Sequence, residues 1–167
     1  FFSVPPSTRN ANQAFTPPIR VQVLDAFGNL VTTATTSVTL SIGNNPGGGT
    51  LSGTTTEAAA SGVAVFNGLS IDRSGTGYTL VANGGALTQA TSTAFDILPL
   101  AASQLAFLVQ PSDVAAGSAI TPAAQIEVRD AIGNRVTSST ASITIAIGVN
   151  PGASTLGGTA TLDAVAG

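Results

Sequence analysis

The segment that best indicates the fold of this chain is Val21-Gln22-Val23-Leu24-Asp25-Ala26-Phe27-Gly28-Asn29. Its first half alternates between the two faces of an extended strand, which is the period of a strand with one buried side. Its second half has the composition of a tight turn, because Gly adopts positive φ without steric cost and Asp and Asn bond to nearby backbone amides. The segment therefore predicts a strand that ends in a fixed corner.

The same corner returns 105 residues later as Asp130-Ala131-Ile132-Gly133-Asn134. Residues 1–62 align with residues 106–167 without a gap, and 30 of the 62 pairs are identical. A repeat of this period indicates a structural unit that is used more than once. We therefore interpret residues 1–104 as a complete repeat and residues 105–167 as the N-terminal part of a second, incomplete repeat.

Between the corners, apolar residues recur at every second position. Val38, Leu40 and Ile42 alternate with polar residues, and Ile143, Ile145 and Ile147 do the same in the second repeat. Seven strands are predicted in the complete repeat, near residues 1–4, 19–24, 37–42, 54–56, 63–66, 78–82 and 92–97. Glycine-rich turns are expected at residues 72–77 and 83–85. Seven short strands in about 100 residues favour an all-β fold of the sandwich type.

The composition argues against catalysis and several kinds of binding. The chain has no His, Lys, Cys, Met or Trp, so the usual general acid–base, Schiff-base and thiolate chemistries lack their side chains. We predict no enzymatic activity and no cofactor. The five arginines form no basic stripe, which excludes nucleic acid as a partner. No apolar stretch approaches the roughly 20 residues of a membrane-spanning helix, so no membrane insertion is expected.

Several blocks of the first repeat resemble bacterial immunoglobulin-like domains of the invasin and intimin type. The resemblance rests on the order of residues 21–29, 50–53, 62–66 and 77–82 and covers all of the first repeat and the available part of the second. It implies an immunoglobulin-like Greek-key sandwich, tandem arrays on extracellular or cell-surface proteins, and a spacer or adhesive role. It carries over no catalytic residue.

The two repeated corners are the first candidate sites. Their Asp, Gly and Asn residues are interpreted as structural turns: Asp25, Gly28 and Asn29, and then Asp130, Gly133 and Asn134. Asp25 and Asp130 could instead contribute to a calcium site at a repeat junction, since calcium prefers oxygen ligands. Because calcium usually needs several acidic ligands and few lie nearby in sequence, we favour turn capping and predict no metal site.

Two further sites are predicted from single positions. Tyr78, the only tyrosine, follows a glycine-rich turn where a penultimate strand begins, which is the place of a tyrosine corner in Greek-key sandwiches. Leu24 and Leu30 flank the first corner on its outward face, and the second repeat has Arg129 and Arg135 at these positions. Leu24, Phe27 and Leu30 are therefore a candidate apolar interface.

The second repeat is not expected to be stable by itself. Leaving Ile143, Ile145 and Ile147 without an opposing sheet would forgo roughly 1.5 to 3 kcal/mol for each side chain. We predict that residues 105–167 pack against strands from outside residues 1–104, supplied by neighbouring repeats or subunits of the same protein. The predicted function is a structural module of a fibre or stalk; the alternative is an adhesin-type module that recognises a sugar or host protein.

Overall fold

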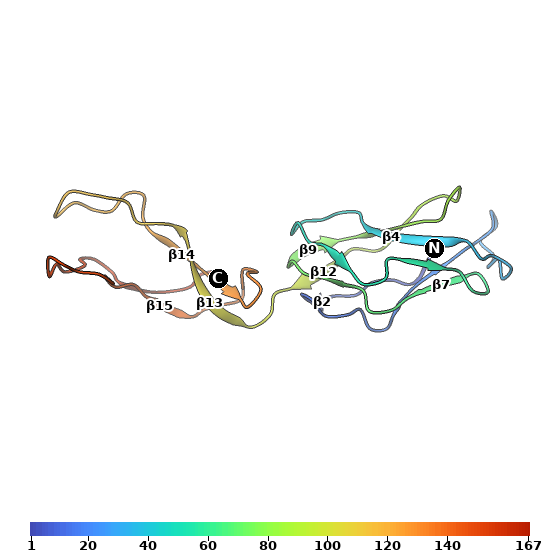
Figure 1. Ribbon diagram of the computed structural model, residues 1–167, viewed down its shortest axis with the longest axis horizontal. Helices are drawn as coiled ribbons and strands as arrows, with labels where there is room; N and C mark the ends of the chain where they lie inside the picture. The colour runs from blue at the N-terminus through green and yellow to red at the C-terminus, as the bar shows by residue number, and fades with distance from the viewer. The chain divides into compact units, whose positions relative to one another are not determined.

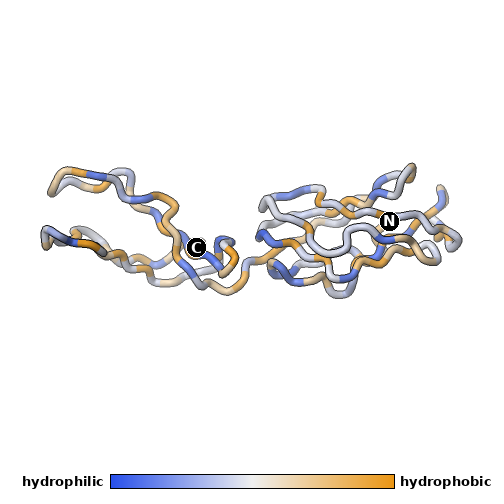
Figure 2. The backbone as a smooth tube through the Cα atoms, viewed as in Figure 1, coloured by the Kyte–Doolittle hydropathy of each residue, from blue (hydrophilic) through white to orange (hydrophobic).

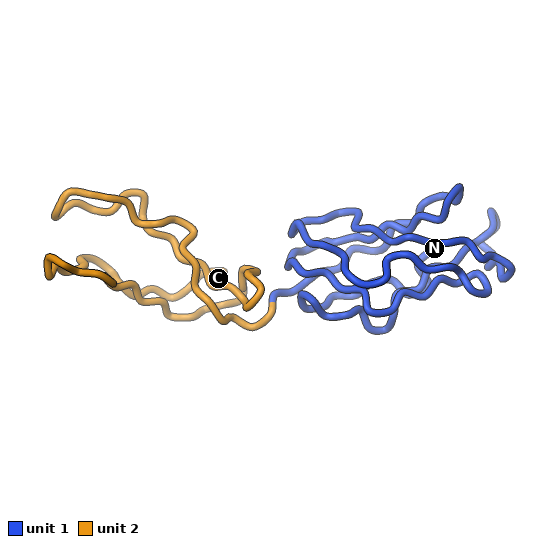
Figure 3. Tube along the Cα trace, viewed as in Figure 1, with its two compact units in different colours: residues 1–99 blue, residues 100–167 orange.

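The computed structural model describes residues 1–167 and contains sixteen strands and no helix (Figure 1). This confirms the predicted all-β fold. No helix is present that could cross a membrane. The chain divides into two compact units, Phe1–Pro99 and Leu100–Gly167 (Figure 3). The boundary expected after residue 104 falls inside strand β13 (Ala102–Val109), whose pairing keeps residues 102–104 within the second unit.

Unit 1 contains two main sheets and two smaller ones. The first main sheet has the order β1-β3-β7, and the second has the order β11-β10-β4-β6. The smaller sheets are β2-β12-β9 and β5-β8. The strands are β1 (Phe2–Val4), β2 (Arg9–Asn10), β3 (Ile19–Gln22), β4 (Ser37–Ile42), β5 (Leu51–Ser52), β6 (Thr56–Ala58), β7 (Val63–Phe66), β8 (Ser70–Ile71), β9 (Gly75–Tyr78), β10 (Leu80–Asn83), β11 (Ala90–Thr91) and β12 (Phe95–Leu98).

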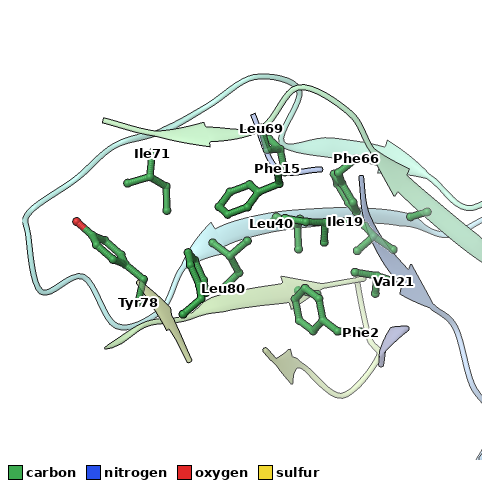
Figure 4. Packing of buried hydrophobic residues seen from close by; sticks show 14 of the residues in the cluster. Phe2, Phe15, Ile19, Val21, Leu40, Phe66, Leu69, Ile71, Tyr78 and Leu80 are labelled. Carbon is green, nitrogen blue, oxygen red and sulfur yellow. The ribbon is translucent and has the colours of Figure 1, made fainter. Parts of the chain in front are cut away.

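One apolar core lies between the sheets of unit 1, as in a β-sandwich (Figure 4). Strand β3 buries Ile19 and Val21 on one side, and β4 buries Leu40 on the other. The alternation in the sequence thus becomes an inward and an outward face. The remaining core members include Phe2, Phe15, Phe66, Leu69, Ile71, Tyr78, Leu80, Phe95 and Ile97.

Two expectations for unit 1 are wrong. Seven strands were predicted, but the unit contains twelve short ones, β1 to β12. The second error concerns a turn. Residues 72–77 were expected to form a turn, but Gly75–Tyr78 is strand β9, which pairs with β12. Glycine is used at position 75 because a Cβ there would lie 3.0 Å from the backbone nitrogen of Gly47 and 3.0 Å from the Tyr78 ring. The glycine permits close packing of two chain segments rather than a change of direction.

Unit 2 has two separate two-stranded sheets. Strand β13 pairs with β14 (Gln125–Asp130), and β15 (Ser142–Thr144) pairs with β16 (Thr161–Asp163). Stretches of high hydropathy occur in this unit as they do in unit 1 (Figure 2). They are less covered, however, because Ile143 and Ile145 are only half-buried and Ile147 is 40% exposed.

Strand pairs of unit 2 occur 105 residues after pairs of unit 1. Phe2 faces Val21 in unit 1, and Phe107 faces Ile126 in unit 2. The Oγ1 atoms of Thr39 and Thr56 lie 2.9 Å apart, and those of Thr144 and Thr161 lie 2.8 Å apart. The sequence similarity between the two segments is therefore matched by the same pairing of residues.

Candidate interaction surfaces

The Asp25 corner is a closed turn held by its own carboxylate. Oδ1 of Asp25 accepts hydrogen bonds from the backbone N–H groups of Phe27 and Asn29, each at 2.9 Å. Gly28 has φ of 85°, in the left-handed region that favours glycine. Hydrogen bonds from the Asn29 backbone and side chain hold the pKa of the Asp25 carboxyl below its ordinary value. The predicted turn residues Asp25, Gly28 and Asn29 therefore lie together, and the carboxylate of Asp25 accepts hydrogen bonds from within the turn.

The Asp25 corner also presents an apolar tip. Phe27 is 90% exposed and Leu30 is 38% exposed, whereas Leu24 is half-buried. Leu24 and Leu30 face each other across an isolated β-bridge. The candidate interface is thus formed mainly by Phe27 and Leu30, at the end of a hydrogen-bonded turn.

The Asp130 corner has the same internal bonds, but its Asp130 and Asn134 side chains are buried. Its Oδ1 accepts from the backbone N–H groups of Ile132 at 3.0 Å and Asn134 at 2.8 Å. Its Oδ2 also accepts from the N–H of Leu100 at 2.9 Å. Burial alone would raise the pKa of the Asp130 carboxyl, but the bonds from Leu100, Asn134 and Ile132 outweigh burial and lower that pKa. Asp130 therefore fixes the first residue of unit 2 as well as its own turn.

The two arginines that replace Leu24 and Leu30 in unit 2 have partners. Arg129 forms a salt bridge with Glu127, and Arg135 donates a hydrogen bond of 3.0 Å to the carbonyl oxygen of Gly167. The two corners thus share their backbone geometry but have different surfaces. The Asp25 corner carries leucines, whereas the Asp130 corner carries arginines that form a salt bridge or a hydrogen bond.

Tyr78 lies fully buried in unit 1. Its ring stacks on Phe95 with a centroid distance of 6.1 Å, and its hydroxyl donates a hydrogen bond of 2.9 Å to the carbonyl oxygen of Arg73. Burial raises the pKa of Tyr78. A Cβ on Gly47 would collide with this hydroxyl and with the Ser74 carbonyl. This environment gives Tyr78 a structural role.

Unit 2 contains an open groove of about 350 Å³. Its large apolar lining residues are Leu108, Ile126, Ile143, Ile145, Leu162 and Val165, and the charged residues Glu127, Arg135 and Asp163 line it as well. In unit 1 the corresponding strands are paired along both edges: β3 pairs with β1 and β7, and β4 pairs with β6 and β10. In unit 2, β14 pairs only with β13, and β15 only with β16. The groove therefore adjoins two free strand edges.

The acidic residues do not gather into a metal-binding group. No cluster of three or more His, Cys, Asp or Glu side chains occurs in the structure. The oxygens of Asp25 and Asp130 instead accept hydrogen bonds from the chain itself.

Sequence reasoning did not find the Leu100–Asp130 bond or the groove. The recurrence of Asp at position 130 marked the acceptor, but nothing in the sequence marked the Leu100 amide as its donor. No protein-family model matches the chain, and no curated protein matches it either.

Proposed function

We propose that this chain is a structural module of an extracellular or cell-surface protein, a fibre or stalk element made of tandem immunoglobulin-like repeats. The observation that carries the proposal is the recurrence of strand pairs and corners at a spacing of 105 residues. A chain that repeats the same strands and corner is suited to an extended array, because each added repeat increases its length by the same amount.

The arrangement of unit 1 supports the immunoglobulin-like, invasin and intimin type of repeat. Strands β1, β3 and β7 follow the order of A, B and E in such a fold, while β4, β10 and β11 follow that of C, F and G. Tyr78 also makes the bond of a tyrosine corner, since its hydroxyl bonds to backbone five residues upstream.

The free edges of β14 and β15 support completion of unit 2 by further strands. In unit 1 the equivalent edges bind β7 and β10, in the registers Ile19 to Phe66 and Leu80 to Ile42. We propose that strands of the same kind, from a neighbouring repeat or from another subunit, add to β14 and β15 by β-augmentation. Self-association is then the main partner interaction of the module.

The chemistry of the corners supports a structural rather than a catalytic role. The carboxylates of Asp25 and Asp130 are engaged by backbone N–H groups, and the pKa of each is lowered, so both favour their charged, hydrogen-bond-accepting form. A general acid would need the opposite shift at neutral pH.

Electron microscopy of the protein isolated from its source tests the proposal. Regular filaments or thin rods with a constant repeat are expected, because tandem units extend in one direction. Filaments that dissociate into subunits would favour strand exchange, whereas rods of single chains would favour a covalent stalk. Compact particles without a repeat would contradict the proposed function.

A further inference from the structure

The same corner exists in this chain in two different environments. Asp130 is fully buried and Asn134 is 5% exposed, whereas Asp25 and Asn29 are both exposed. The turns themselves do not cause this difference, because each has the same backbone bonds. The N–H of residue 28 or 133 donates to the Asp carbonyl at 3.1 Å in both corners.

The difference comes from the segment that enters unit 2. The Leu100 N–H donates to Oδ2 of Asp130 at 2.9 Å, and the Gln104 side chain donates to the Asp130 carbonyl oxygen at 2.7 Å. Oδ2 of Asp130 therefore has two donors, the Leu100 amide and the Asn134 side chain. Oδ2 of Asp25 accepts from the Asn29 side chain at 3.1 Å.

The surface beside Asp25 suits an apolar segment. Phe27 is 90% exposed, whereas Ile132, its counterpart in the covered corner, is 36% exposed. Leu30 adds a second apolar side chain, while the covered corner has Arg135 at that position. An extended segment with an apolar side chain could cover Phe27 and Leu30 while its amide binds the carboxylate, and Leu100 within Leu98-Pro99-Leu100-Ala101 has these properties.

We infer that the Asp25 corner is a docking site for the apolar connecting segment of another copy of the repeat, whose counterpart of the Leu100 N–H donates to Asp25 Oδ2. The same carboxylate would then join successive repeats at every junction, with Phe27 and Leu30 packed against the incoming leucine. The inference rests on the proposed function, because it requires a preceding repeat.

The test adds one copy of residues 1–105 before residue 1 of the full chain. In this fusion the added Leu100 precedes Asp25 of the second copy by 30 residues. Leu100 and Asp130, which are hydrogen-bonded, are separated by the same number of residues. Amide hydrogen exchange, measured by NMR, reports each leucine separately. We expect the added Leu100 amide of the fusion to exchange at least about tenfold more slowly than the same amide in a fusion that carries Asp25→Ala in its second copy.

Two further variants separate docking from loss of folding. Asp130→Ala should release the original Leu100 amide and leave the added one protected. Phe27→Ser changes a side chain that is 90% exposed, so the turn should persist while protection of the added Leu100 falls several-fold. Exchange of the added Leu100 that is insensitive to both Asp25→Ala and Phe27→Ser would overturn the inference. Electron microscopy could still show a repeating fibre in that case. Failure of the docking inference can therefore be distinguished from failure of the proposed function.

Discussion

The hydroxyl of Tyr78 donates a hydrogen bond of 2.9 Å to the carbonyl oxygen of Arg73, while the Tyr78 ring lies fully buried against Phe95. The bond ties strand β9 to the segment that precedes it. It also gives a polar group inside an apolar core the partner that burial requires.

Tyr78→Phe should therefore destabilise unit 1 without changing its fold. The variant keeps the ring and leaves the Arg73 carbonyl without this donor, which should lower the free energy of unfolding by about 1 to 2 kcal/mol. Urea unfolding followed by circular dichroism measures the change, because Tyr78→Phe removes the only tyrosine of a chain without tryptophan and so precludes fluorescence. Ser41→Ala, at an exposed position of β4, is the control and should stay within about 0.5 kcal/mol of the parent chain. Equal stability of the Tyr78→Phe variant and the parent would show that the bond does not contribute.

Gly43 and Gly148 form a matched pair for testing how the two units differ. A Cβ on Gly43 would lie 2.8 Å from Thr79 Oγ1 and 2.9 Å from a methyl carbon of Val81, whereas a Cβ on Gly148 meets nothing within 4 Å. Gly43→Ala should cost about 1 to 2 kcal/mol, since Thr and Val side chains are stiff. Gly148→Ala should be neutral or slightly stabilising. Equal losses in the two variants, measured by urea unfolding, would contradict this difference in packing.

The buried carboxylate of Asp130 predicts a loss of stability in acid. Because its pKa is lowered in the folded state, the unfolded chain takes up this proton first as the pH falls. Its contribution is therefore present above the ordinary Asp pKa of about 3.9 and is lost as the pH falls below it. The urea midpoint of unit 2 should fall more between pH 5 and pH 3 in the parent than in Asp130→Asn. Asp113→Asn, at an exposed carboxylate, should keep the parent's pH dependence. Parallel curves for the parent and Asp130→Asn would rule out this role of Asp130.

The sequence predicted those parts of the fold that depend on local pattern. Residues 37–42 alternate and become β4 over the same six residues, because alternation directly determines which side chains face the core. The Asp25 corner was predicted because its Asp, Gly and Asn act within five residues of one another.

Features that depend on distant contacts were not predicted. The glycines near Tyr78 suggested a turn, yet Gly75 allows close contact with Gly47, which is 28 residues away. The Leu100–Asp130 bond joins residues 30 apart, and a leucine amide carries no signature in sequence. The half-buried state of Ile143 and Ile145 likewise depends on which strands lie opposite them, and their own alternation does not specify this.

Completion of unit 2 is the central claim, and grafting residues 63–104 after Gly167 tests it most directly. The graft continues the register, since Gly167 corresponds to Gly62, and it supplies copies of β7 and β10 for the free edges of β14 and β15. We expect the amides along the free edges of β14 and β15 to become protected from hydrogen exchange. Ile145→Ala should then cost roughly 2 to 5 kcal/mol, as expected of its buried counterpart Leu40, and Gly148→Ala should become destabilising. Unchanged exchange at β14 and β15, with Ile145→Ala as mild as in the parent chain, would contradict the account.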